Sequence, residues 1–319
     1  MTPKKRFFMF KNTIKLLASN FSIFWKVLLY KLIVIGIITG LFCATLSWIT
    51  KLPEFATLTS STLSFFSVAN LAGGPTAIIT ALGTMLESLY IFLIALATTY
   101  PVIFVYVLVL IFVILPYLWH LSDLATNEGV FGYMSSQTKY GFTSSFVRRL
   151  NRASAFSWAF TIVILPFNII FLTGIVGICT LATLHPVWLI AAIAILFAWI
   201  ILYYAFRTTL LGCWSSAITA TNCKTWKGLG KGLHAVSRNF LRILSNSIVI
   251  LFILALVFLL TSPFGSVILI PLYCFVMAVF GMVAFFEHQG MRYYVDFNTI
   301  ISPKKLELTD KVKKIKFII

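Results

Sequence analysis

The side chains that could do chemistry in this chain are few, and most stand apart. His120 and Asp123 are three residues apart, on one side of a helix if the helix continues, and His288 follows Glu287. Neither pair has the second histidine four residues away that a zinc-binding helix carries. We therefore predict no metal site and no cofactor, and we interpret Glu287, His288 and Arg292 as an ion-pair group at a helix end.

Motifs that position a nucleophile or cradle a phosphate are missing from the sequence. It contains no G-x-S-x-G, no G-x-x-x-x-G-K-[ST] and no G-x-G-x-x-G. Cys213 and Cys223, ten residues apart in a predicted loop, form no C-x-x-C pair. We interpret the glycine-rich run Gly228-Leu229-Gly230-Lys231-Gly232 as a flexible interfacial linker. No catalytic residue is expected, and the chain is predicted not to be an enzyme.

Composition sets the class of protein. Of 319 residues, 60% are hydrophobic and only 10% are charged, whereas soluble domains carry about a quarter charged residues. This excludes a water-soluble globule, a disordered chain and a coiled coil. Because a membrane crossing takes about 20 apolar residues, the chain has room for several crossings. The 25 basic and 8 acidic residues leave a formal net charge of +17.

We predict an all-α, polytopic membrane protein with six transmembrane helices in three hairpins. Two arrangements are possible between the first crossing and Asp123. One helix from Leu89 to Trp119 gives six crossings in all, and two helices, Thr76 to Thr98 and Val102 to Leu118, give seven. The chain 1–319 is interpreted as one membrane domain with a basic cytoplasmic tail at 290–319. The six predicted spans are approximately 28–50, 89–118, 154–183, 187–206, 243–262 and 266–286.

The distribution of basic residues favours six crossings. With six, 24 of the 25 lysines and arginines, all but Lys51, fall on one side of the membrane. Cytoplasmic loops are enriched in lysine and arginine, so this side is predicted to be cytoplasmic, with both termini there. Lys26 and Lys31, at the start of the first span, are expected to reach back to the interface.

Three basic segments that precede spans are predicted to be amphipathic interfacial helices. Before the first span, Phe10, Ile14, Leu17 and Phe21 recur at helical spacing, with lysines between them. Cations at this depth are each attracted to an anionic leaflet by about 1 kcal/mol. The predicted partner is therefore the lipid bilayer and its anionic phospholipid head groups, not nucleic acid. The candidate lipid contacts are Lys11, Lys15, Arg148, Arg149, Arg152, Lys227, Lys231 and Arg238.

Two of these segments end in the same pair, Asn20-Phe21 and Asn239-Phe240. With the basic lead-in helices and six spans, this layout resembles a group of bacterial integral membrane proteins that includes the membrane domain of some glycerophosphodiester phosphodiesterases. The resemblance covers Phe10 to about Asp296. It implies a membrane domain without the catalytic domain, and it carries over no catalytic residue.

Few polar groups lie at membrane depth. Asn168 and Glu87 are the candidate cavity-lining residues; an interhelical hydrogen bond is the plainer role of Asn168. Pro101, Pro116, Pro166 and Pro271 are expected to kink their helices. The uncharged, hydroxyl-rich segment Phe55–Leu86 is either a re-entrant lid or a plain loop.

These features suggest an integral protein of the bacterial cytoplasmic membrane that acts, without catalysis, in transport or membrane-lipid handling. One alternative is a scaffold whose basic loops dock a cytoplasmic protein or anionic lipid. The other is a lipid-modifying enzyme, which would need His120, Asp123, Glu287 and His288 to meet at one membrane face.

Overall fold

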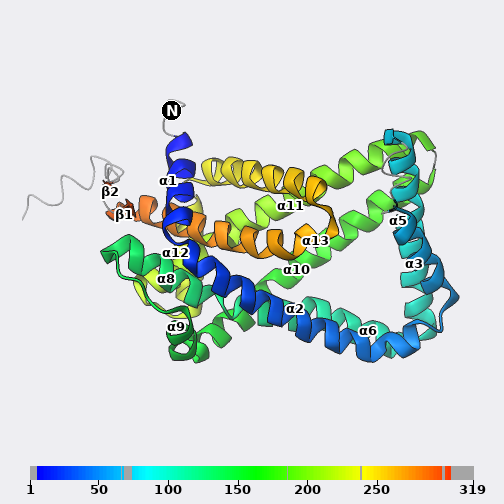
Figure 1. Ribbon diagram of the computed structural model, residues 1–319, viewed down its shortest axis with the longest axis horizontal. Coiled ribbons are helices and arrows are strands. Elements are labelled where there is room, and N and C mark those ends of the chain that lie inside the picture. Colours follow the sequence, from blue (N-terminus) through cyan, green and yellow to red (C-terminus); the bar gives the residue numbers. More distant parts are fainter. Residues whose placement is uncertain are drawn as a thin grey trace, which may run out of the picture. The chain divides into compact units, whose positions relative to one another are not determined.

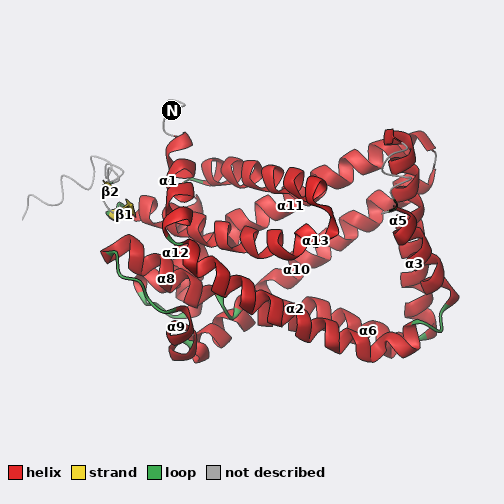
Figure 2. Ribbon diagram, viewed as in Figure 1, coloured by secondary structure: helices red, strands yellow, loops and turns green. Residues whose placement is uncertain are grey.

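The computed structural model is helical throughout most of its described length (Figures 1 and 2). It describes residues 6–65, 67, 74–184, 186–237, 239–296 and 299–302. Arg238 and the tail from 303 onward therefore lie outside the described residues. In chain order the elements are α1 (Arg6–Ser19), α2 (Phe21–Ile49), α3 (Pro53–Phe65), α5 (Gly74–Thr99), α6 (Pro101–Val109), the π-helix η2 (Leu110–Ile114), α7 (Leu115–His120), α8 (Asp123–Ser136), α9 (Phe142–Arg148), α10 (Leu150–Leu184), α11 (Pro186–Thr221), α12 (Thr225–Ser237), α13 (Phe240–Gln289), β1 (Tyr293–Asp296) and β2 (Thr299–Ile301).

The helical, membrane-spanning class of the chain is confirmed. Among the described residues, seven helical stretches are long and apolar enough to cross a membrane, judged by length and composition. They are Phe21–Ile49, Thr80–Thr99, Pro101–Ser136, Leu150–Ile178, Ala194–Thr221, Phe240–Val257 and Ile268–Gln289. The last two are parts of α13, whose ribbon turns back on itself between its yellow and orange portions in Figure 1.

The predicted single helix over 89–118 is interrupted at Tyr100. This residue has φ −130° and ψ 66°, so α5 ends at Thr99 and α6 begins at Pro101. Proline explains the break, because it disfavours the helical conformation in the residue before it and is well suited to the first helical position. The structure thus has the two-helix alternative in this region.

Pro116 changes the helix in a different way. Immediately before it, Leu110–Ile114 form a π-helical turn in which the Leu115 N–H donates to the Leu110 carbonyl. Since Pro116 lacks an N–H and its ring crowds the carbonyl four residues back, a wider turn accommodates it. Pro166 lies inside the continuous helix α10.

The chain divides into two compact units, described separately below. Unit 1 comprises residues 1–32, 119–159 and 204–319, and unit 2 comprises 33–118 and 160–203. In unit 1, α1, the start of α2, α8, α13 and β1 share one core. Aromatic pairs such as Phe24 with Phe275 and Phe131 with Phe286 join its helices.

Unit 2 contains two helices in the region of Phe55–Leu86, which the sequence predicted to be either a re-entrant lid or a plain loop. Within Phe55–Leu86, the described residues are helical apart from the bend at Ser67, so a plain loop is wrong for them. Helices α3 and α5 pack together and run across the direction of α6 (Figure 1). The α3 hydroxyls bond to carbonyls of their own helix, as Thr59 does to Phe55 and Thr62 to Leu58. This satisfies polar side chains without water.

Each basic lead-in helix is followed closely by a long helix: Asn20 alone separates α1 from α2, Arg149 alone separates α9 from α10, and Asn239 directly precedes α13 after α12. The carbonyls of Asn20, Arg149 and Asn239 accept N–H groups three or four residues later, which starts the long helix. The same junction therefore occurs three times in the chain.

The segment predicted as a loop after the fourth span is mainly helical. Helix α11 continues to Thr221, so Cys213 is buried in a helix. The glycine-rich run belongs to α12, and its interpretation as a flexible linker is wrong. A Cβ on Gly232 would lie 3.1 Å from the backbone of Cys213 and Trp214, so this glycine allows α12 to approach α11 closely.

Candidate functional site

The most unusual residue of unit 1 is a buried lysine. Lys31, in α2, is only 1% exposed, so the expectation that it reaches back to the interface is wrong. Its ammonium group donates to the Trp119 carbonyl and lies 4.5 Å from the centre of the Trp119 ring. The carboxylate of Asp123 is 3.6 Å away. A buried charge is costly unless it is paired, and these contacts supply the partners.

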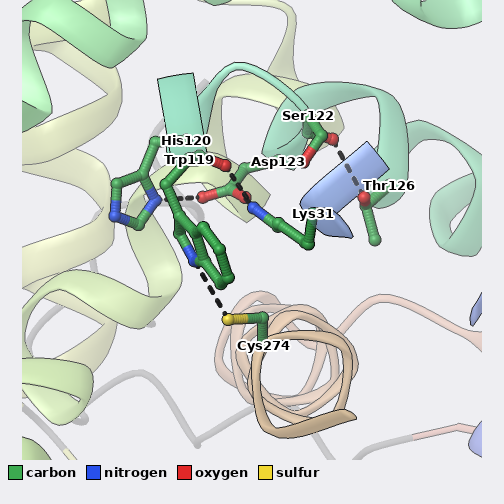
Figure 3. Close-up of polar contacts among 7 residues, drawn as sticks. All are labelled: Lys31, Trp119, His120, Ser122, Asp123, Thr126 and Cys274. Atoms are coloured by element: carbon green, nitrogen blue, oxygen red, sulfur yellow. Dashed lines mark hydrogen bonds and ion pairs between the residues drawn. The ribbon is translucent and has the colours of Figure 1, made fainter. Parts of the chain in front are cut away.

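His120 and Asp123 do meet, as their spacing predicted. His120 ends α7 and Asp123 begins α8, with a two-residue turn between them, and His120 Nδ1 lies 2.5 Å from Asp123 Oδ2. Asp123 therefore contacts His120 through one carboxylate oxygen and Lys31 through the other. Figure 3 shows the two basic groups on opposite sides of this carboxylate.

Side chains from two further helices complete this cluster. The indole N–H of Trp119 donates to Cys274 Sγ of α13 at 3.2 Å (Figure 3). Arg207 of α11 acts electrostatically on His120 and Cys274, and its guanidinium lies 5.7 Å from the Tyr204 ring. We call Lys31, Trp119, His120, Asp123, Arg207 and Cys274 the lysine cluster.

Helix α8 is buried along most of its length and carries a second charged group. Glu128 is 4% exposed and pairs with Arg148, and with Arg149 through a 2.9 Å contact to Nε. Next to it, Asn127 is fully buried, and neither side-chain amide atom has a hydrogen-bond partner among the described residues. Unit 1 thus buries charged and polar groups in addition to its apolar core.

The predicted lipid contacts of the middle segment have protein partners. Arg148 and Arg149 neutralise Glu128, and Arg152 donates to the Asn222 side chain and to the Cys223 carbonyl. Arg148 keeps most of its side chain exposed. Contact of these three arginines with anionic lipid stays a prediction.

The other two lead-in helices expose only part of their predicted apolar faces, since Phe10 and Leu17 of α1 pack against the core and Val236 of α12 is buried in it. Helix α1 buries Asn12, Thr13 and Leu16 and exposes Ile14, with the exposed lysines Lys11 and Lys15 beside it. Lys15 also pairs with Asp296 at 3.1 Å.

Helix α12 has the same arrangement. It buries Gly228 and Gly232 and exposes Trp226 and Leu233, with Lys227 exposed and Lys231 partly exposed. Apolar side chains beside cations are typical of a helix in the membrane interface.

The two candidate cavity-lining residues lie in unit 2. Tyr203 of α11 donates a hydrogen bond to Asn168 Oδ1 of α10 at 3.0 Å, which is the interhelical bond expected of Asn168. The rings of Tyr203 and Phe171 stack with centres 4.3 Å apart, which positions the phenol. Glu87 is an exposed residue of α5.

Glu287 belongs to a network different from the one predicted. Its carboxylate pairs with Arg242 at 2.9 Å rather than with Arg292, and it accepts a 3.1 Å hydrogen bond from the Tyr293 hydroxyl. Asn12 donates to that same hydroxyl at 2.9 Å. Burial, and then the Glu287 carboxylate, raise the pKa of Tyr293 far above its usual range. This network fastens α1 to the end of α13 and to β1.

Among the described residues, no group of three or more histidine, cysteine, aspartate or glutamate side chains could hold a metal ion. The ionisable groups of α7, α8 and α13 form separate pairs, His120 with Asp123 and Glu287 with Arg242. The lysine cluster brings the opposite charges of Lys31 and Asp123 within 3.6 Å of each other.

Sequence reasoning missed three residues of these networks, Lys31, Tyr203 and Tyr293. Lys31 looked like an interfacial residue because it precedes a long uncharged run. One signal was available: Leu32–Thr50 alone is long enough to span, so Lys31 had no need to be at the surface.

Comparison of the chain with protein families, with curated proteins and with solved structures finds no match.

Proposed function

We propose that this protein is a multi-pass protein of the cytoplasmic membrane that binds anionic phospholipid head groups and takes part, without catalysis, in membrane-lipid handling or transport. The observation that carries the proposal is the arrangement of α1 and α12. Helix α1 exposes Ile14 beside its exposed lysines, although it also buries Met9 and Leu16 in the core. Helix α12 exposes Trp226 and Leu233 and buries mainly small residues. In water such faces would be unfavourable, whereas at a bilayer surface they bury in the acyl boundary next to phosphate groups.

The proposed topology has six crossings with both termini in the cytoplasm. The crossings are α2, the stretch from α6 to α7, α10, α11 and the two apolar parts of α13. Helix α5 is long and apolar enough to be a seventh. Its packing along α3, and the direction of both helices across α6 in Figure 1, support a helical pair at the outer membrane face instead. Six crossings also place 24 of the 25 lysines and arginines on one side of the membrane, which the positive-inside rule favours.

Lipid analysis of purified protein tests the proposal. The variant Lys11→Gln/Lys227→Gln/Lys231→Gln removes three charges from the outward faces of α1 and α12. At about 1 kcal/mol per charge, it should weaken binding of anionic lipid by up to roughly a hundredfold. The anionic lipid that co-purifies in mild detergent, counted per protein by mass spectrometry, should fall while zwitterionic lipid stays constant.

A matched control keeps the change in net charge but alters other positions. The variant Lys51→Gln/Lys139→Gln/Lys224→Gln also loses three exposed lysines, none of them on α1 or α12. It should retain the lipid composition of the wild type. Equal loss of anionic lipid in both variants would mean that binding depends on net charge alone, which contradicts the proposed role of the two helices.

The charged groups buried in unit 1 favour transport as a second candidate. Charged groups inside membrane proteins are expensive and usually line a route for an ion or a substrate. Lys31, Asp123 and Glu128 are three such groups. Uptake of candidate solutes into vesicles that contain the purified protein would test this function, with Lys31→Met as the variant expected to lose it.

A further inference from the structure

The charged residues of the lysine cluster stand at the ends of uncharged parts of the chain. Lys31, Asp123 and Arg207 directly border the uncharged stretches 32–50, 88–122 and 153–206 respectively. In the topology proposed above, these three ends all lie on the cytoplasmic side. The lysine cluster is therefore close to the depth of the inner head groups, just outside the hydrocarbon core, where lipid phosphates and dissolved anions are both present.

Positive charge exceeds negative charge in this cluster. Among the described residues, Asp123 is the one carboxylate that pairs with a member of the cluster, and it pairs with both Lys31 and His120. Arg207 takes part in none of the ion pairs found in the described part of the chain. Since His120 never carries negative charge, the two cations have a single counter-charge between them. A charge held away from water is costly without a partner, so the cluster lacks an anion.

The two cations flank the same region of unit 1. Both Lys31 and Arg207 act electrostatically on His120, and both act on Cys274 of α13. Side chains from α2, α7 and α13 gather around the turn that leads into α8 (Figure 3). This region is open to a ligand, because Arg207 is partly exposed and the side chain of Asp123 is 25% exposed.

Two buried polar side chains beside Asp123 have no hydrogen-bond partner. Ser122 and Asn127 are fully buried, and neither the Ser122 hydroxyl nor the Asn127 amide is bonded to any described residue. Ser122 directly precedes Asp123, and Asn127 follows it by one helical turn, on the same side of α8. A buried polar group without a partner in a native protein indicates a water molecule or a ligand that the protein chain does not supply.

We propose that the lysine cluster binds a phosphate group, held by Lys31 and Arg207. Phosphate oxygens accept hydrogen bonds without donating, and the planar guanidinium of arginine binds such oxygens in pairs. The bound group supplies the negative charge that the cluster lacks. It belongs either to dissolved phosphate or to the head group of an inner-leaflet lipid, which present the same chemistry. The site is separate from the lipid contacts proposed above, because no residue of the cluster belongs to α1 or α12.

Inorganic phosphate tests the site with a free anion. The purified full chain, in a detergent that contains no phosphate, is titrated with inorganic phosphate at neutral pH by calorimetry. Arg207→Gln removes the cation that has no ion pair, and the loss of a charge-assisted contact should weaken binding at least tenfold. The control Lys224→Gln removes an exposed lysine between α11 and α12 and should bind phosphate as the wild type does.

Phosphatidic acid tests the same site with a phosphate carried by a lipid. Each protein is incubated with this lipid in detergent, and the lipid molecules that stay bound after washing are counted by native mass spectrometry. The wild type should retain one molecule that Arg207→Gln loses and Lys224→Gln keeps. The variant Lys11→Gln/Lys227→Gln/Lys231→Gln should also keep this molecule, whatever else it loses. Failure of lipid binding at α1 and α12 and failure of this site are therefore distinguishable.

The two assays identify the source of the phosphate. A loss confined to inorganic phosphate assigns the site to a dissolved anion, a loss confined to phosphatidic acid assigns it to a head group, and either result supports the proposal. Arg207→Gln that binds as the wild type does in both assays would overturn it, as would a wild type that binds neither ligand or an equal loss in Lys224→Gln. Should Arg207→Gln fail to fold, Arg207→Lys serves instead, because losing the planar guanidinium should weaken binding severalfold, and unchanged binding would overturn the proposal.

Discussion

Two glycines lie at the contact between α11 and α13, and a methyl group added to one would meet backbone whereas a methyl group added to the other would meet open space. A Cβ added to Gly281 would lie 3.0 Å from the carbonyl carbon of Gly212 and closer still to its oxygen. The obstacle is backbone, which cannot rotate away as a side chain would. A Cβ added to Gly212 would meet nothing within 4 Å. The variants Gly281→Ala and Gly212→Ala therefore place the same methyl group on the two sides of one contact.

The expected effects have opposite signs. Replacing glycine by alanine inside a helix favours the helix by about 1 kcal/mol. Overpacking a close contact costs about 1–3 kcal/mol, and a backbone obstacle places Gly281 toward the upper end of that range. We expect Gly281→Ala to lose about 1–2 kcal/mol of stability and Gly212→Ala to gain up to about 1 kcal/mol.

The assay is the fraction of each purified variant that remains monodisperse after heating in detergent. The temperature at which half of the protein is no longer monodisperse should fall by a few degrees in Gly281→Ala and should not fall in Gly212→Ala. A Gly281→Ala protein that survives heating as well as the wild type would refute the close approach of α11 and α13.

Three further predictions concern buried polar groups. Glu128→Gln should lower stability by about 1–2 kcal/mol, because Arg148 and Arg149 lose their counter-charge but are themselves partly exposed to solvent; the thermal-unfolding assay measures this, and Glu87→Gln at an exposed position should have no effect. Tyr203→Phe removes the hydrogen bond to Asn168 and should cost about 1 kcal/mol, with a loss above 3 kcal/mol showing that more than this bond depends on the hydroxyl. The pKa of Tyr293 is raised in the folded protein, so its contribution is complete below the unfolded pKa of about 10 and is lost as the pH rises above it. Denaturation between pH 9 and 11 should therefore show a decline in stability that is smaller in Tyr293→Phe, and identical declines would contradict the burial of the phenol.

Local sequence signals predicted several parts of this protein well. The helical class follows from composition, and the exposure of Ile14, Trp226 and Leu233 beside lysines agrees with helical periodicity. His120 and Asp123 lie close together as their spacing allowed, although a turn separates them instead of a continuing helix. The hydrogen bond of Asn168 was expected from the rarity of polar groups in apolar helices. Apart from composition, these signals are short-range patterns in the sequence.

Long-range packing was not predictable in the same way. Asn12 and Tyr293 are bonded although 281 residues separate them, and Lys31 reaches Trp119 across 88 residues. Helix α8 is buried on nearly all sides and mixes polar with apolar residues, so it lacks the one-sided pattern that marks a packed helix. Its burial depends on which helices surround it, and a single sequence does not contain that information.

The central claim is that the basic loops of this chain face the cytoplasm and that α3 lies outside. Cysteine labelling in intact cells tests it most directly, with the five native cysteines replaced and a single cysteine introduced at Ser60 or at Ser135, both exposed. An impermeant maleimide should label Ser60→Cys from outside and should label Ser135→Cys only after the membrane is permeabilised. Labelling of Ser135→Cys in sealed cells would contradict the proposed topology.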